Sequence, residues 1–342
     1  MTAKLRVLVL THEDMLPPDD LKDKSDPRLK ECRTEVNVRD ALLKLGHEVK
    51  LLGIEDDITR LRKTIEEWQP GIVFNLMEAF AYNGALDYYI VSYLDMLRIP
   101  YTGCNPRGLI LARDKALSKK LLCFHRIRVP KFKTFSYGQK INKNHLNNLP
   151  YPMIVKSMYE QGSVGISQAS IVQNNEELIS RVGQMHDLTT QDVIAEQYIE
   201  GRELYITVIG NQRLQTFPIR EITFDHIDNK MHRIATYNVK WNDDYRKRWG
   251  IKYQFARHLP NGIEDKIIKL AKRIYRLLDM SGYARLDLRL TAEGEIYVLE
   301  VNPNAAVANN DDIAHSAEKA GLNYEQLIQR MLNLGLGAKQ SH

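Results

Sequence analysis

The first hundred residues alternate short apolar runs with amphipathic stretches. Buried strands are predicted for the apolar runs 6–10, 49–54, 71–76 and 99–103. Helices are predicted where apolar residues recur at helical spacing, at 38–48, 61–69 and 85–98, with Gly46 ending the first of them. Because strands separated by helices of this length favour right-handed crossovers, residues 1–108 predict a Rossmann-like parallel α/β domain.

A polar segment at residues 14–31 interrupts this alternation. It carries three prolines and many charged residues, and it predicts an inserted surface loop. A mobile lid is one interpretation of such a loop.

The pattern changes near residue 130, where the predicted strands come in pairs. A helix at 112–127 and a strand at 129–135 come first, and a helix at 174–185 lies between the pairs. The paired runs are 151–157 with 165–172 and 192–199 with 203–210. This arrangement is typical of an α+β module.

The last third returns to long helices. Weak periodicity at 225–258 predicts that this stretch includes a long loop, and strong helical spacing predicts a helix at 262–280. Two strands within 285–304 and two helices, at 311–321 and 323–335, follow. The fold class predicted for the whole chain is therefore mixed, α/β followed by α+β.

Composition restricts the kinds of partner that the protein can bind, but it does not restrict the fold. The 342 residues allow two or three domains, and the net charge of +5 suits an anionic small molecule but is too diffuse for nucleic acid. The cysteines, Cys32, Cys104 and Cys123, lie far apart, which favours a reducing compartment. The first apolar run is too short for a signal peptide, and no run approaches the roughly 20 apolar residues of a membrane span. We therefore expect a cytoplasmic protein with no membrane contact.

Polar side chains interrupt the two apolar strands predicted within 285–304. Asp287 and Glu300 lie 13 positions apart, which suits antiparallel strands joined by a turn at 291–294, and Asn302 shares a face with Glu300. Two carboxylates and an amide oxygen are hard ligands that suit Mg²⁺ carried in with a nucleotide. Arg285, on the face of Asp287, would neutralise a transferring phosphoryl group. A solvated strand edge would explain one acidic residue, but not this set.

Three further stretches carry weaker signals. Lys156 ends a strand and precedes a loop with Gly162, Ser163 and Gly165, which suits phosphate binding, although a hairpin loop with a solvated lysine is an alternative. Ser163 would contact phosphate or substrate, or only its own loop. The hairpin that contains Glu196 and Glu203 offers a strand edge for adenine and a carboxylate for ribose, or is a plain hairpin. A lysine such as Lys115, near a helix start, is ordinarily solvated.

Taken together and in this order, these stretches resemble the ATP-grasp superfamily, and within it the D-alanine–D-alanine ligases. The matching segments are YTGCNPRGLILARDKALSKKLL, KSMYEQGSVGI, VIAEQYIEGREL and RLDLRLTAEGEIYVLEVNPN. The spacing from Asp287 to Glu300 and Asn302 is the most specific part. The resemblance implies an ATP-grasp fold after the N-terminal domain, with subdomains at 109–200 and 201–336 and a tail at 337–342.

The resemblance also implies a role for each position. Lys115 and Lys156 would hold ATP phosphates, and the loop from Glu160 to Gly165 would close over them. The remaining ATP and metal positions are Glu196, Gln197, Tyr198 and Ile199 for adenine, Glu203 for ribose, and Asp287, Glu300 and Asn302 for two Mg²⁺ ions, with Mn²⁺ as a substitute. Arg285, Lys156 and Ser163 form the catalytic set. The implied reaction activates a carboxylate as an acyl phosphate with Mg-ATP, and an amine then attacks it to form an amide.

The substrate end departs from the family pattern. In the run NPNAAVANNDDIAHSA, Asp311 stands near the position of a serine that reads a carboxylate in the family, and an Asp favours a cation there. Arg33 stands where the family has a glutamate that binds an amine. Gly162 replaces a usual serine, and Trp241 stands at a loop tyrosine.

We therefore hypothesise a ligase whose substrates are not two D-alanines. Its acyl donor would carry an extra negative group read by Arg33, and its amine acceptor would be basic, or would lack a carboxylate, and be read by Asp311 or Asp312. Helix capping by one of these aspartates is the alternative. Trp241 and Asn304 are further candidate substrate contacts.

Other functions stay open at this point. They are a D-alanine–D-alanine or D-alanine–D-lactate ligase with altered contacts, a non-catalytic ATP-binding protein, and phosphotransfer without ligation. The expected partners are a small carboxylate and a small amine, together with a second copy of the chain in a homodimer.

Overall fold

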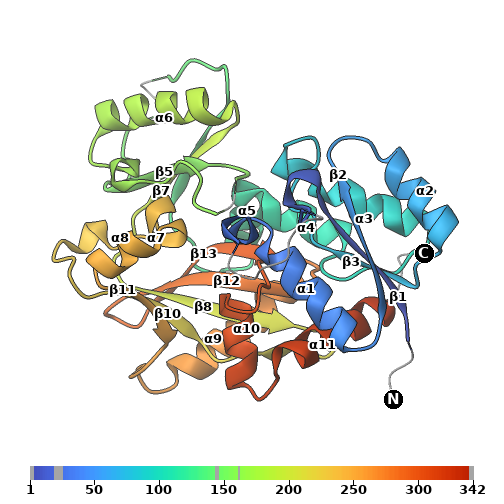
Figure 1. The fold of residues 1–342 in the computed structure, drawn as a ribbon. Helices are drawn as coiled ribbons and strands as arrows, with labels where there is room; N and C mark the ends of the chain where they lie inside the picture. The colour runs from blue at the N-terminus through green and yellow to red at the C-terminus, as the bar shows by residue number, and fades with distance from the viewer. Residues whose placement is uncertain (1–3, 19–25, 143–145, 161, 339–342) are drawn as a thin grey trace.

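The computed structural model describes residues 4–18, 26–142, 146–160 and 162–338, and three β-sheets organise them (Figure 1). Residues 19–25 of the predicted inserted loop lie outside the described residues. The flanks of this segment form two 3-10 turns, Glu13–Met15 and Pro27–Lys30. Whether the segment acts as a lid stays a prediction.

The first sheet is parallel, in the order β2-β1-β3, which confirms the α/β prediction. Its strands are β1 (Arg6–His12), β2 (Glu48–Ile54) and β3 (Ile72–Asn75). Its connecting helices are α1 (Arg33–Lys44), α2 (Thr59–Trp68) and α3 (Asp87–Met96). The strand predicted at 99–103 is wrong, since only Tyr101 bridges to Val73. Pro100 has no N–H to donate, and Gly103 turns the chain with a φ of +95°.

The second sheet is antiparallel, in the order β4-β7-β5-β6, and α6 (Asn175–Thr189) covers it. Its strands are β4 (Phe132–Phe135), β5 (Met153–Ser157), β6 (Ile171–Val172) and β7 (Val193–Gln197). Most of the strand predicted at 165–172 is wrong, because Gly165 turns with a φ of +71° and a 3-10 turn occupies Gln168–Ser170. The helix predicted at 112–127 is two helices, α4 (Pro106–Arg113) and α5 (Lys115–Phe124). Asp114 is extended between them and caps the second.

The third sheet, in the order β11-β10-β8-β12-β13 with β9 beside β8, is the largest. Its strands are β8 (Arg202–Ile209), β9 (Gln215–Thr216), β10 (Arg220–Phe224), β11 (Ile251–Phe255), β12 (Tyr283–Leu290) and β13 (Ile296–Pro303). Helix α9 (Ile263–Leu277) packs Ile267, Ala271 and Ile274 against it. The loop predicted within 225–258 occupies residues 225–236, broken by one 3-10 turn (Lys230–His232), and the rest of this stretch contains α7 (Tyr237–Trp241), α8 (Asp243–Arg248) and β11, which were not predicted. Helices of one or two turns are too short to show a period.

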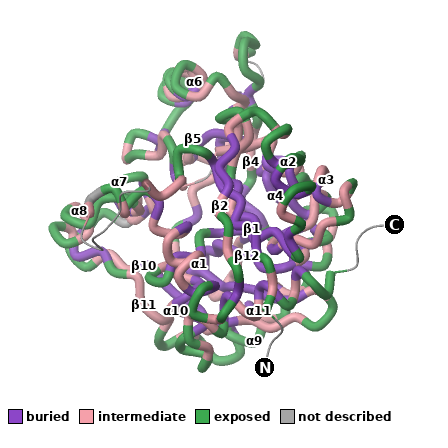
Figure 2. Tube along the Cα trace, turned by 45° about the vertical axis from the view of Figure 1, so that its right-hand side comes forward, coloured by how far each residue is buried: buried purple, intermediate pink, exposed green. Residues whose placement is uncertain are grey.

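Two helices, α10 (Asp312–Lys319) and α11 (Tyr324–Leu336), join the third sheet to the first. Leu327, Ile328 and Met331 of α11 share one apolar core with Val7 and Val9 of β1. Figure 2 shows that β1 and β12 are buried, whereas α6 lies at the exposed far end of the second sheet. The boundaries predicted at 108/109 and 200/201 stay a prediction.

None of the helices in the described ranges has the length and the apolar character that a membrane crossing needs.

Two glycines let the first sheet's last connection meet the third sheet. Gly282 has a φ of +68°, and a Cβ built on it would lie 2.3 Å from the carbonyl oxygen of Gly103. The side chain of Asn304 closes the same junction, because its Oδ1 accepts a hydrogen bond of 2.7 Å from the backbone N–H of Cys104. Asn304 is buried, so this contact of a predicted substrate residue is structural; a substrate role stays a prediction.

We predict that Gly282→Ala destabilises the protein by about 2–3 kcal/mol, because the added methyl group meets rigid backbone in a left-handed conformation. The free energy of unfolding in urea measures this. Gly321→Ala is the control, since Gly321 has a φ of +89° but no heavy atom within 4 Å of the place that a methyl group would take. Equal losses in both variants would contradict the close contact.

Candidate active site

The antiparallel pairing of β12 and β13 places two acids opposite each other. Asp287 pairs with Glu300 and Arg285 with Asn302 in the strand register, and the register shifts directly after Asp287. Directly opposed residues lie on one face of a sheet with their side chains close together. Asn302 Nδ2 donates to Glu300 Oε1 at 3.4 Å. The strand pairing predicted from the sequence is confirmed.

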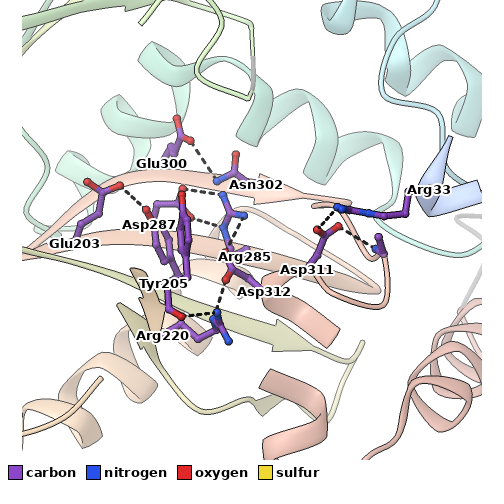
Figure 3. Close-up of polar contacts among 12 residues, drawn as sticks. Arg33, Glu203, Tyr205, Arg220, Arg285, Asp287, Glu300, Asn302, Asp311 and Asp312 are labelled. Carbon is purple, nitrogen blue, oxygen red and sulfur yellow. Dashed lines mark hydrogen bonds and ion pairs between the residues drawn. The ribbon is translucent and has the colours of Figure 1, made fainter. Parts of the chain in front are cut away.

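Arg285 forms a forked ion pair with Asp287. Its Nε and Nη2 lie 2.8 and 3.0 Å from the two carboxylate oxygens, and its guanidinium lies 5.2 Å from the ring centre of Tyr205 on β8 (Figure 3). Burial raises the pKa of Asp287 to about 6, against the lowering effect of Arg285. This guanidinium is therefore fixed in position beside the acids.

Three lysines balance the charge of the second acid, Glu300. Although burial alone would raise it, the pKa of Glu300 is held well below its usual range by the ammonium groups of Lys115, Lys156 and Lys240. Lys115 donates to the carbonyl oxygens of Met158 and Glu160 at 3.3 and 2.6 Å. Burial lowers the pKa of Lys115 to about 8. Positive charge thus gathers beside Glu300.

A further carboxylate, Glu196, sits between two of the lysines. Its oxygens lie 3.0 Å from Lys156 Nζ and 3.3 Å from Lys119 Nζ. Lys119 Nζ also donates to the carbonyl oxygen of Leu299 on β13. These contacts tie α5 and β5 to β7 and to the acid-bearing strand.

A cleft lies between the second and third sheets. Nine predicted residues line it: Lys156, Ser163, Glu196, Gln197, Tyr198, Ile199, Glu203, Asp287 and Glu300. Lys240 and Arg289 also line it and were not predicted. Lys115, Arg285 and Asn302 do not line the cleft, but each contacts or electrostatically influences a residue that does.

Glu203 is held at the cleft wall by two donors. The hydroxyl of Tyr205 and Nη2 of Arg289 each lie 2.7 Å from its carboxylate oxygens. Arg289 also lies 5.6 Å from the ring centre of Tyr198. The carboxylate predicted to contact ribose is therefore fixed in the wall before any ligand binds.

The glycine loop contacts the segment before and within α7. Ser163 Oγ donates to the carbonyl oxygen of Ala235 at 2.7 Å, and Trp241 Nε1 donates to that of Gly162 at 2.9 Å. Gln161, inside the predicted loop, lies outside the described residues. Trp241 thus contacts the loop, while a direct substrate contact stays a prediction.

Charged residues cluster at the opposite end, toward the first sheet. Arg33 Nη2 lies 3.0 Å from Asp311 Oδ1, and Asp312 Oδ1 lies 2.8 Å from Arg220 Nε (Figure 3). Asp311 occupies the N-cap position of α10, but its other oxygen accepts from the N–H of Ala308 and not from the helix. Helix capping therefore does not account for this side chain.

The sequence analysis did not predict Arg289, Lys119 and Lys240 as site residues. The features of the sequence that could have identified them differ. Arg289 lies two positions after Asp287 on one strand, and Lys119 lies four positions after Lys115 on one helix, so both share a face with a predicted residue. Lys240 sits in the aperiodic stretch before Trp241, and only the fold brings it to Glu300.

The oxygen donors of this site suit a hard metal ion only if a bound ligand supplies further donors. Within the ranges that the structure covers, no group of three or more His, Cys, Asp and Glu side chains is placed to hold a metal by itself. Asp287, Glu300 and Asn302 supply two carboxylates and one amide, all oxygen donors that Mg²⁺ accepts, and Mg²⁺ commonly completes its shell with phosphates and water. The residues fit a metal–nucleotide complex.

One buried carboxyl group near this end is bound by a hydroxyl group. Glu35, in the first turn of α1, accepts a hydrogen bond of 2.8 Å from Thr11 Oγ1 at the end of β1. Burial raises the pKa of Glu35 to about 7.

Comparison with known proteins gives one family and several relatives. The family described as D-ala D-ala ligase C-terminus matches residues 124–333. The chain is 29% identical over 307 residues to the uncharacterized protein y4sG of Sinorhizobium fredii, covering 86% of this chain and 84% of y4sG. It is 29% identical over 243 residues to D-alanine–D-alanine ligase A of Bacillus cereus, covering 71% and 74% of the two chains.

Two solved structures share the fold. The D-alanine–D-alanine ligase of Bacillus anthracis complexed with ATP has a TM-score of 0.74 at 20% identity, covering 97% of both chains. The VanG D-Ala:D-Ser ligase of Enterococcus faecalis has a TM-score of 0.72 at 19% identity, covering 97% of this chain and 100% of VanG. The fold predicted from the sequence is confirmed.

We predict that Glu35→Gln removes a pH dependence of stability. Between an unfolded pKa of 4.5 and a folded pKa of about 7, the folded protein keeps a proton that the unfolded chain releases. This contribution is therefore fully present below pH 4.5 and is lost as the pH rises through 7, a change of roughly 3 kcal/mol. The difference in unfolding free energy between wild type and variant, measured at pH 4 and pH 8, should change by this amount.

Glu264→Gln serves as the control, because Glu264 is an exposed residue in the first turn of α9. The same pH effect in both variants, or none in Glu35→Gln, would contradict the interpretation.

Proposed function

The chain belongs to the family described as D-ala D-ala ligase C-terminus, and from this premise we propose that it is an ATP-dependent carboxylate–amine ligase. The observation that carries the proposal is the cleft that Asp287 and Glu300 line together with the buried Lys156 and the half-buried Lys240. Opposed acids would hold metal ions and lysines would hold phosphate oxygens. This charge pattern suits a nucleotide triphosphate with its metals.

The nucleotide would lie along the cleft wall. The backbone at Glu196–Ile199, the last residues of β7 and those that follow, would meet adenine, and Glu203 would accept ribose hydroxyls. Lys115, Lys156 and Lys240 would meet the phosphates, together with Ser163 and the N–H groups of the glycine loop. Asp287, Glu300 and Asn302 would hold two Mg²⁺ ions, which offset the negative charge that develops on phosphates in transfer.

The proposed reaction has two steps. A carboxylate oxygen of the donor attacks the γ-phosphorus of ATP, and the bond to the β-phosphate oxygen breaks, which gives an acyl phosphate and ADP. The amine nitrogen of the acceptor then attacks the acyl carbon, phosphate leaves with the electron pair of the C–O bond, and the nitrogen loses a proton. Arg285, fixed by Asp287, would stabilise the oxyanion of the tetrahedral state.

Water must be excluded from the acyl phosphate, and the glycine loop would do this. The bond from Trp241 to Gly162 O and the bond from Ser163 to Ala235 O attach the loop to the residues around α7. Such attachment favours a closed loop over the cleft.

The substrates proposed here are not two D-alanines, because Arg33 and Asp311 carry charges that oppose those of an alanine substrate. A D-alanine–D-alanine ligase with altered contacts is the second candidate, which the sequence similarity to the Bacillus cereus enzyme favours. An ATP-using enzyme with free thiols at Cys32, Cys104 and Cys123 suits the cytoplasm. Homodimer formation through residues 1–108 stays a prediction.

We predict ADP and phosphate release from Mg-ATP that requires both an acid and an amine, with a product lighter by one water than their sum. A matrix of acids and amines, with D-alanine alone as one well, tests this by coupled ADP detection and product mass. ATP binding without release in any well would contradict a ligase, and turnover with D-alanine alone would favour the second candidate.

Asp287→Asn should lower kcat by about 10²-fold or more in the productive well, because a charge on the proposed metal site is lost. The control is Asp244→Asn, an exposed acid on α8 that lies outside the cleft. Similar kcat values in both variants would show that Asp287 takes no part in catalysis.

We predict that Trp241→Phe uncouples the reaction. One neutral hydrogen bond contributes about 1 kcal/mol, so the closed loop should be roughly fivefold less populated and more acyl phosphate should meet water. The ratio of ADP to amide product should rise above one. Trp249→Phe is the control, since Trp249 packs against Tyr245 and Arg248 away from the loop. An unchanged ratio in Trp241→Phe would show that the loop closes without this bond.

A further inference from the structure

We infer that the Arg33–Asp311 ion pair is an exchangeable recognition element: a second anionic group of the acid substrate takes Arg33, and a cationic group of the amine substrate takes Asp311. The inference rests on the proposed ligase function and names its substrate class. The donor is an acid with a second acidic group, and the acceptor is an amine with a second basic group.

The pair stands next to the group proposed to stabilise the oxyanion. Asp311 is followed by Asp312, whose Oδ2 lies 3.9 Å from Nη1 of Arg285 (Figure 3). Arg33 begins α1, which follows β1 of the first sheet, and Asp311 directly precedes α10, which follows β13 of the third sheet, so the pair joins segments that follow two different sheets. A substrate whose reacting carbon lies at Arg285 would bring its distal groups to this pair.

The pair is more exposed than the two ion pairs beside it, chiefly because of Arg33. The side chains of Arg33 and Asp311 are 41% and 22% exposed, against 8% and 18% for Arg220 and Asp312 and 18% and 5% for Arg285 and Asp287. The contact is also a single one, from Nη2 to Oδ1. The Nε of Arg33 is buried and has no hydrogen-bond partner among the described residues. A guanidinium has five N–H donors, so Arg33 keeps donors for a carboxylate or another anion.

Asp312 is committed elsewhere. Its Oδ1 lies 2.8 Å from Nε of Arg220, both side chains are largely buried, and Arg220 is held in turn by the carbonyl oxygen of Tyr253 and the ring of Phe255. Asp312 therefore bridges Arg220 and Arg285 and helps to position the latter. Arg33 and Asp311 are therefore the residues that recognise the charged groups of the substrates.

The shared bond makes the two substrates depend on each other. Burial raises the pKa of Asp311, and Arg33 opposes that rise. An acid that takes Arg33 away leaves Asp311 as an unpaired, largely buried anion, which is costly until a cation replaces the guanidinium. An amine that takes Asp311 leaves Arg33 unpaired in the same way. Each substrate should therefore strengthen the binding of the other, and the effect must be reciprocal.

The same charges disfavour D-alanine at both places. As a donor its ammonium group would approach Arg33, and as an acceptor its carboxylate would approach Asp311. Like charges brought together oppose binding, which is a common source of specificity.

The test compares matched probes with the full-length protein and Mg-ATP. The acids are succinate and butyrate, and glutamate and 2-aminopentanoate; the amines are 1,4-diaminobutane and 1-aminobutane, and lysine amide and norleucine amide. Each pair differs by one distal charged group. The readouts are kcat/KM for acid- and amine-dependent ADP release and the KM of each acid at low and saturating amine.

For wild type we expect at least a tenfold preference for the doubly charged member of each pair, and at least a fivefold fall in the acid's KM at saturating amine. Arg33→Met should abolish the preference among acids, and Asp311→Asn the preference among amines. Either variant should abolish the fall in KM. The exchange R33D/D311R keeps an ion pair for folding, and it should move the preference to singly charged acids and amines.

Lys44→Met is the matched control. Lys44 pairs with Glu325 at 3.0 Å and also joins α1 to a C-terminal helix, but it lies at the other end of α1. It should leave preference and coupling unchanged.

The outcomes separate the two proposals. Turnover that ignores the distal charge, or a preference that survives both Arg33→Met and Asp311→Asn, overturns this inference and leaves the ligase intact. No acid- and amine-dependent release with any probe or in the wider matrix overturns the ligase and this inference with it.

Discussion

The hydrogen-bonded register between β12 and β13 determines where every charge of the cleft can stand. It sets Asp287 opposite Glu300, and β8 on the other side of β12 sets Tyr205 beside Asp287. Two opposed carboxylates in a buried place repel each other unless cations surround them. The arginine on the same strand and the lysines from α5, β5 and α7 supply those cations. The packing of the second sheet over the third is therefore coupled to the electrostatics of one strand pair.

The sequence predicted the parts of this arrangement that depend on local periodicity. The parallel first sheet follows from short apolar runs that alternate with helical spacing, and α9 and the β12–β13 pair follow from longer regular spacing of apolar residues. The acids could be predicted to meet because both lie on one hairpin, but the register shift after Asp287, which sets Glu300 and not Leu299 opposite it, has no signal in the spacing. Arg289 and Lys119 share faces with predicted residues and were within reach of the same reasoning.

What could not be predicted depends on tertiary contacts or on very short elements. Helices α7 and α8 are five and six residues long, and they lie in the chain between β10 and β11, the strands at the far edge of the third sheet. Lys240 lies in that segment and acts electrostatically on Glu300, and no spacing along the chain predicts this interaction. The Arg33–Asp311 contact joins residues 278 positions apart. The sequence predicted that Arg33 and Asp311 each recognise a different substrate, and the fold shows that the two side chains contact each other.

The apolar core that α11 shares with β1 has a consequence for synthesis of the chain. Val7 and Val9 emerge from the ribosome early, whereas Leu327, Ile328 and Met331, which cover them, emerge late. One apolar face of the first sheet therefore stays uncovered until α11 has been translated. Domains usually fold in order as they are made, and waiting apolar surfaces are where aggregation begins. Chaperone dependence and solubility during expression should respond more to changes in α11 than the distance of this helix from the cleft suggests.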